Sequence, residues 1–126
     1  MHMAKKKDKL KLNKEVNASV KYVRVSPYKL RKVADSVRHL PPSIALQHLK
    51  IMPQKSAFIL YKLFHSCVSN AVNNFSLDES TLKTSKLIVN EGPKLKRSQP
   101  RARGRIFGIL KPYSHVELTM VSQGEE

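Results

Sequence analysis

Residues 94–111, KLKRSQPRARGRIFGILK, contain seven cationic side chains and no acidic one. Four of the seven are arginines, whose planar guanidinium carries five donors and can grip a phosphate with two of them. Small or kinked residues interrupt the cations and let the backbone approach a crowded partner: Ser98, Pro100, Ala102 and Gly104. The pattern predicts binding to a polyanion. Arginine-rich segments that become ordered on contact are a known mode of RNA binding.

The whole chain is basic as well. It has 126 residues, with 24 Lys and Arg against 9 Asp and Glu, a formal charge of +15 and a pI near 10.2. Such a charge attracts polyanions from a distance, whereas a surface that is merely soluble mixes both signs. The partner could be nucleic acid, an anionic membrane or an acidic protein. No apolar run approaches the ~20 residues of a membrane span, so we expect no transmembrane helix. We expect no membrane partner either, since the apolar stripes of the helices are all needed to build a core.

Enzyme and metal signatures are missing from the sequence. Cys67 is the only cysteine, which excludes an intramolecular disulfide and fits a reducing compartment. His65 is close to it on a predicted helix, but side chains two positions apart do not face each other, which disfavours a nucleophilic pair. The histidines lack metal-ligand spacing, and Asp78-Glu79 is expected to be a solvated loop pair. We expect no enzymatic activity, no metal and no cofactor.

Several elements must position the basic stretch. Residues 18–25 alternate as a strand, with Val20, Tyr22 and Arg24 on one face and Lys21, Val23 and Val25 on the other. Ser26-Pro27 predicts an N-cap and first helical turn, and this helix ends at Pro41-Pro42. Ser43 is expected to cap a short second helix, and the longest helix is expected from Gln54 to about Asn73.

The rest of the chain is predicted to be extended. One strand ends at Val89, Gly92-Pro93 marks a bend, and residues 115–121 alternate as a second strand. The basic stretch then forms a hairpin reaching roughly 30 Å beyond the body, at ~3.3 Å per residue. A lone two-stranded ribbon is marginal in water, so this hairpin needs a partner. The sequence shows no recognition helix, zinc ligands or basic zipper of the kind found in DNA-binding proteins. This favours RNA as the partner.

Three motifs carry a resemblance to a known family: RVSPYKLRKVAD at 24–35, SAFILYKLFHSCVSNAVNN at 56–74, and VNEGPKLKRSQPRARGRIFGILK at 89–111 followed by Ser114-His115. The chain resembles the bacterial-type large-subunit ribosomal protein number twenty-two over about residues 18–122. The resemblance implies an α+β fold: a strand, three helices and two strands, with a small three-stranded antiparallel sheet packed on the helices. The long basic hairpin, about 91–112, protrudes between the last two strands. We expect a flexible basic arm at 1–17 and a short tail at 123–126.

The resemblance also implies a function. The chain would be a structural constituent of the large ribosomal subunit that binds and organises rRNA. The hairpin tip would line the nascent-peptide tunnel near the macrolide site, opposite large-subunit protein number four. Other implied partners are proteins near the exit and the nascent peptide, and no homo-oligomer is expected. The location would be the large subunit in a bacterial cytoplasm or an organelle stroma. The alternatives are a free-standing RNA chaperone or regulator, and a cationic membrane-surface protein.

Carried over by motif, the expected RNA-binding residues are Arg24, Ser26, Lys29, Arg31, Lys32, Lys94, Lys96, Arg97, Arg101, Arg103, Arg105, Lys111, Ser114 and His115. The expected tunnel-lining tip is Leu95, Lys96, Arg97, Ser98, Gln99, Pro100, Arg101, Ala102 and Arg103. This sequence departs from the family pattern at Ile106-Phe107, which makes that limb more apolar, at Pro112-Tyr113, and in its longer N-terminal arm.

Overall fold

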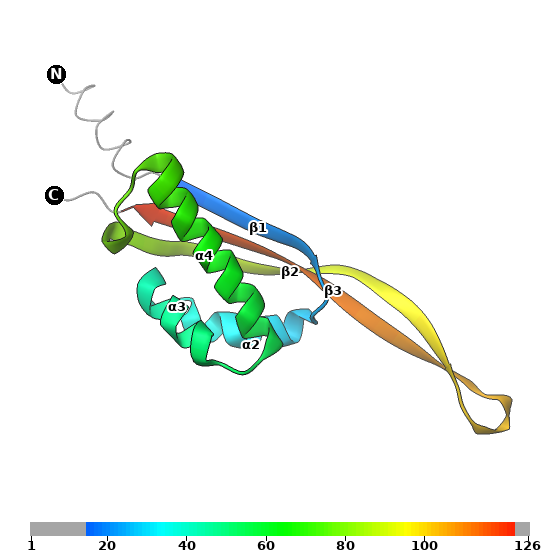
Figure 1. The fold of residues 1–126 in the computed structure, drawn as a ribbon. Coiled ribbons are helices and arrows are strands. Elements are labelled where there is room, and N and C mark those ends of the chain that lie inside the picture. Colours follow the sequence, from blue (N-terminus) through cyan, green and yellow to red (C-terminus); the bar gives the residue numbers. More distant parts are fainter. Residues whose placement is uncertain (1–14, 123–126) are drawn as a thin grey trace, which may run out of the picture.

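The computed structural model describes residues 15–122 (Figure 1). The elements in chain order are β1 (Glu15–Val23), α2 (Pro27–Val37), α3 (Pro42–Ile51), α4 (Lys55–Phe75), the short 3-10 helix η1 (Glu79–Thr81), β2 (Leu82–Pro100), the 3-10 turn η2 (Ala102–Gly104) and β3 (Ile106–Ser122). The strands form one antiparallel sheet in the order β1-β3-β2. This confirms the predicted α+β fold and its order of elements.

The helices cover one face of this sheet. Along the body half of β3 every second residue, from Ser114 to Ser122, is buried. These residues meet the apolar stripes of the helices, and the largest fully buried side chains include Phe64, Leu30, Leu49, Leu60, Leu118 and Met120. None of residues 96–110 belongs to the core. We call residues 91–112 the basic hairpin and the other described residues the body.

Of the two helix caps predicted from the sequence, one is confirmed and the other is wrong. The Ser26 hydroxyl accepts a hydrogen bond from the backbone N–H of Lys29 at 3.4 Å, which confirms the predicted cap of α2. The predicted Ser43 cap of α3 is wrong. The helix begins at Pro42 after Pro41, with no side-chain cap. Proline is favoured at the first helical position because its φ is already helical, so the helix starts before Ser43.

The first strand begins earlier than predicted. Residues 15–17 were expected in the flexible arm, but they pair with 119–121 of β3. Val16 is only 1% exposed, so a single apolar side chain among charged neighbours anchors this end of β1 in the core. The rest of the predicted arm, residues 1–14, and the predicted tail, residues 123–126, lie outside the described residues.

The predicted alternation along β1 is also wrong. The register shifts between Val20 and Val23, where two residues of β1 face His115 alone. Tyr22 has φ 59° at this bulge, and its N–H donates to Nδ1 of His115 at 3.1 Å. The extra residue turns Val20 and Val23 to the same side, so both pack on the core. Simple period-two alternation cannot anticipate a bulge.

Strand β2 continues past the predicted end at Val89 as far as Pro100. Gly92-Pro93, predicted as a bend, form a second bulge, since the register shifts between Glu91 and Lys94 while both limbs stay paired. A Cβ at Gly92 would lie 3.0 Å from the backbone carbonyl of Tyr113. Glycine therefore allows the two strands to stay close where the hairpin leaves the body.

Cys67 lies in the core on α4, with no exposed surface. Its Sγ donates to the carbonyl oxygen of Val16 at 3.5 Å. Burial raises the pKa of the thiol from 9.0 to about 11, although a backbone hydrogen bond at Met120 opposes the rise. Between pH 9.0 and about 11 the thiol therefore stays protonated in the folded protein, whereas it already ionises in the unfolded chain.

This difference predicts a pH dependence of stability. The folded thiol has the higher pKa, so its contribution is complete below pH 9.0 and is lost as pH rises through about 11. We expect wild type to lose on the order of 2 kcal/mol more than Cys67→Ala over this range. Urea unfolding of both proteins at several pH values measures the difference. Parallel curves would contradict the predicted burial of the thiol.

Candidate RNA-binding surface

The basic hairpin is a paired ribbon that projects away from the helices (Figure 1). Its last pair is Pro100 with Ile106, and the backbone N–H of Arg101 donates to the carbonyl of Arg105 at 2.7 Å. Arg103 has φ 63° and Gly104 has φ 71°, so the chain reverses through two left-handed residues. The closing turn is thus residues 101–105.

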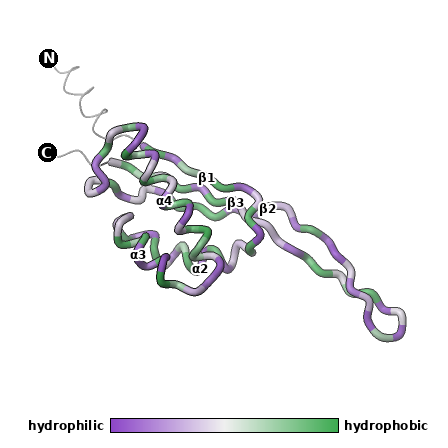
Figure 2. The backbone as a smooth tube through the Cα atoms, viewed as in Figure 1, coloured by the Kyte–Doolittle hydropathy of each residue, from purple (hydrophilic) through white to green (hydrophobic). Residues whose placement is uncertain are grey.

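This turn divides the predicted tip. Arg101, Ala102 and Arg103 lie in the turn itself, while Leu95–Pro100 form the outgoing limb of the ribbon. All the cations of the hairpin are exposed: Lys94, Lys96, Arg97, Arg101, Arg103, Arg105 and Lys111. Figure 2 shows hydrophobic residues among the hydrophilic ones on the ribbon. Glu91 at the root of the hairpin is its one acidic residue, and no other lies between it and Glu117, so nothing on the outer ribbon balances this charge.

A groove of about 930 Å³ lies where the hairpin meets the body. Cations from four elements and a loop line it, and no acidic side chain does: Arg24, Lys29, Lys32, Lys55, Arg97 and Lys111. We call this set the basic groove. Five of the six were predicted from the sequence, and the structure brings those five together from β2, β3, α2 and the β1–α2 loop.

Two helices begin at the basic groove. Ser26 precedes α2 and Gln54 precedes α4, and both residues line the groove. The N-terminal end of a helix carries a partial positive charge and free N–H donors. Ser26 already caps α2, but Gln54 makes no side-chain cap, which leaves donors of α4 open to a ligand. The groove therefore combines side-chain and backbone groups that bind phosphate.

Arg31 has a partner within the body. Its guanidinium donates to the carbonyl of Val89 at 3.1 Å, and Arg38 donates to the carbonyl of Leu87 at 3.0 Å. Both carbonyls belong to β2, which is an edge strand of the sheet. The two arginines of α2 thus satisfy backbone groups that an edge strand would otherwise expose. Asp35 pairs with Arg38 and helps to hold it there.

Ser114 and His115 do not line the basic groove but make contacts beside it. Ser114 is fully buried, and its hydroxyl donates to the carbonyl of Val25 at 2.6 Å. His115 accepts the N–H of Tyr22, and the two rings meet edge to face with centroids 4.9 Å apart. Both predicted site residues therefore tie β3 to the end of β1 and the start of α2.

A family model described as "Ribosomal protein L22p/L17e" matches residues 18–121. The chain belongs to this family. Three relatives illustrate the match. The large ribosomal subunit protein uL22 of Petrotoga mobilis is 46% identical over 118 residues, covering 94% of this chain and 79% of the relative. The uL22c protein of Thalassiosira pseudonana is 42% identical, covering 85% and 93%. The uL22 protein of Clostridium novyi is 45% identical, covering 84% and 96%.

Membership in the L22p/L17e family confirms the predicted resemblance and the prediction that the chain is not an enzyme. Within residues 15–122 no group of three or more His, Cys, Asp or Glu side chains could hold a metal ion. In the same part of the chain, no helix is long and apolar enough to cross a membrane.

Lys55 is the groove cation that was not predicted from the sequence. It is the first residue of α4, and it lines the groove together with Arg97 and Lys111 of the hairpin. The sequence has Pro53 just before a strong helical stripe of apolar residues, which places Lys55 at the start of a helix. This feature could have identified Lys55 as a candidate. In this member of the L22p/L17e family, the groove therefore extends from α2 to α4.

Proposed function

We propose that this chain is a structural protein of the large ribosomal subunit that binds and organises rRNA through the basic hairpin and the basic groove. The observation that carries the proposal is a projecting ribbon that has no acidic residue beyond Glu91 at its root, where it opens into a cationic groove. A ribbon of this kind repels itself and buries nothing in the body. A folded polyanion supplies both the counter-charge and the packing contacts that the ribbon lacks.

The hairpin is the part of the molecule that reaches deepest into its partner. The seven pairs from Lys94–Pro112 to Pro100–Ile106 span about 20 Å at ~3.3 Å per residue, and the closing turn lies beyond them. We place the closing turn and the outer limb, which include Leu95–Arg103, at the wall of the nascent-peptide tunnel. There the turn would face large-subunit protein number four and the nascent peptide, and changes at Leu95, Lys96 or Arg97 would alter susceptibility to macrolides.

The location follows from the same proposal. Relatives named as large-subunit proteins come from bacteria, and two named uL22c come from Thalassiosira pseudonana and Phaeodactylum tricornutum. This chain belongs to the large ribosomal subunit of a bacterium or a plastid. Its neighbours there are rRNA and other large-subunit proteins.

A salt titration tests the binding of rRNA. With roughly eight phosphates neutralised, log affinity should fall against log salt with a slope of about −6 to −7, because bound cations release counterions. Filter binding of the purified chain to large-subunit rRNA, transcribed in vitro, measures this slope. A slope near zero would contradict binding through phosphates.

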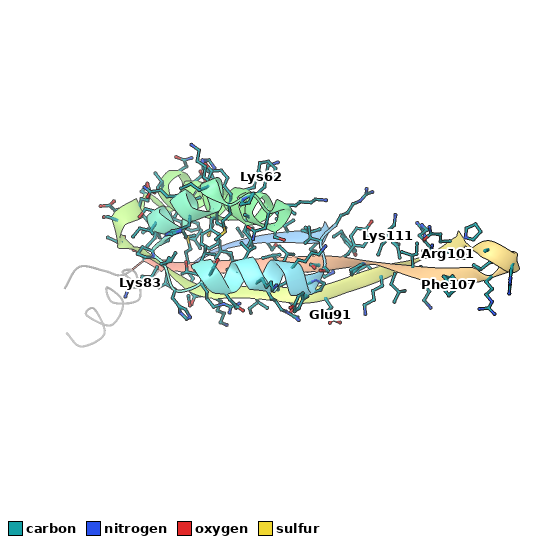
Figure 3. The ribbon with its side chains drawn as sticks, turned by 90° about the horizontal axis from the view of Figure 1, so that it is seen from below. Lys62, Lys83, Glu91, Arg101, Phe107 and Lys111 are labelled. Atoms are coloured by element: carbon teal, nitrogen blue, oxygen red, sulfur yellow. The ribbon has the colours of Figure 1, made fainter. Side chains whose placement is uncertain are left out.

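A matched pair of variants connects the slope to the groove. Lys55→Ala removes a groove cation and should reduce the slope by about one unit. Lys83→Ala removes an exposed lysine at the end of the body far from the hairpin (Figure 3) and should leave the slope unchanged. Equal effects of the two variants would mean that the groove has no special part. Sedimentation in sucrose gradients excludes a free-standing RNA chaperone if the protein travels with the large subunit.

A further inference from the structure

Two exposed apolar side chains lie at the outer end of the return limb of the hairpin, and neither the charge nor the groove explains them. Ile106 is 71% exposed and Phe107 53%, whereas Leu110, 57% exposed, lines the basic groove. Figure 3 shows Phe107 on the distal part of the ribbon, far from α2, α3 and α4. The hairpin has only two strands, and within residues 15–122 no second layer covers either of its faces. Exposure of a phenylalanine to water is unfavourable in this position, so we expect a partner outside the described residues to cover it.

The pairing of the strands defines the surroundings of Phe107. It lies opposite Gln99, and the next pair toward the body on the same face is Arg97 with Ile109. Ile106 is paired with Pro100 and points to the other face, because successive residues of a strand alternate. Phe107 therefore shares a face of the ribbon with Arg97, which is one same-face position nearer the body and whose guanidinium donates to the carbonyl of Lys96 at 2.9 Å. The ribbon carries no acidic residue between Glu91 and Glu117.

We infer that Phe107 is a stacking platform for an unpaired RNA base, with Arg97 beside it to bind the phosphate of the same strand. Single-stranded bases stack on aromatic side chains while nearby cations follow the backbone. An apolar protein surface with few acidic residues would leave the surrounding arginines without counter-charge. The charge of the ribbon therefore favours an RNA base as the group that covers Phe107. The inference rests on the proposed function and adds a base-contacting residue to it.

Binding of full-length variants to the organism's own large-subunit rRNA, transcribed in vitro, tests the inference. Phe107→Ala should weaken binding about 5- to 150-fold, the range for loss of one stacked base. Phe107→Leu should not restore it, since leucine is apolar but has no flat ring. Ile106→Ala, on the opposite face, should change the affinity less than about twofold. The salt slope should stay unchanged in Phe107→Ala, because no charge is removed.

A second measurement observes the stack itself. The chain contains no tryptophan, so Phe107→Trp introduces a single fluorescent reporter. On adding the RNA, its emission should be quenched and its access to acrylamide should fall, while Ile106→Trp should stay accessible. An affinity of Phe107→Leu or Phe107→Ala within twofold of wild type, with the wild-type salt slope intact, would overturn the stacking inference alone. A wild-type chain that fails to bind the RNA would overturn the proposed function as well.

Discussion

Replacing residues 96–110 with an Asn-Gly dipeptide is expected to weaken rRNA binding on the order of 100-fold or more, through loss of charge-assisted phosphate contacts, while the body stays folded. Leu95 and Lys111 are directly paired, so a two-residue turn can close the shortened ribbon. The change removes Lys96, Arg97, Arg101, Arg103 and Arg105. With five cations lost, the salt slope should become shallower by about four units. Filter binding over a range of salt measures both quantities.

The control for this change is a variant with body charges removed outside the basic groove, at Lys62, Lys83 and Lys86. It should keep most of the affinity. Circular dichroism should show the shortened protein with its helices intact, since no residue from 96 to 110 belongs to the core. A shortened protein that is unfolded would refute the division into body and hairpin.

Phe64→Ala is expected to have the largest effect on stability. Phe64 lies on α4 with no exposed surface and is among the largest fully buried side chains. Truncation of a buried phenylalanine costs about 3–5 kcal/mol, which is a large part of the ~5–15 kcal/mol that holds a typical domain together. For a chain of this size the midpoint of thermal unfolding should fall by roughly 10–20 °C. Thermal melts followed by circular dichroism measure the shift.

Phe58→Ala is the matched control on the same helix. Phe58 is 58% exposed, and Lys62 lies over its ring with Nζ 4.5 Å from the centroid. Removing this ring creates no cavity and loses only an exposed cation–π contact, so the cost should stay below about 1 kcal/mol. Similar losses for the two variants would show that α4 packs with a different face toward the sheet.

Much of the fold was predictable because period and capping are local properties. The stripe of α4 and the Ser26-Pro27 start of α2 need only a few neighbouring residues to specify them, and both were confirmed. The basic hairpin was predictable for a similar reason, since its charge excludes it from any core. The structure extends α4 to Phe75 and ends it at Ser76, whose φ of 52° is left-handed.

The errors have a common physical origin in contacts between distant segments. The bulge at Tyr22 depends on His115, and the early start of β1 depends on a place for Val16 in the core. The same holds for the candidate site. Arg31 looks like a free cation in the sequence, but Val89 lies 58 positions away and supplies its carbonyl. Lys55 joins the groove only because α4 begins beside the hairpin.

Strands β2 and β3 cross from the body into the hairpin without a break, and Gly92 marks the crossing. The contacts that hold the helices against the subunit therefore also set the direction in which the projecting ribbon points. The direction of the ribbon relative to the helices is a property of the folded body, and the close approach of Gly92 to Tyr113 is part of what fixes it. Enlarging Gly92 would misdirect the ribbon over its full reach, although every cation on it would be retained.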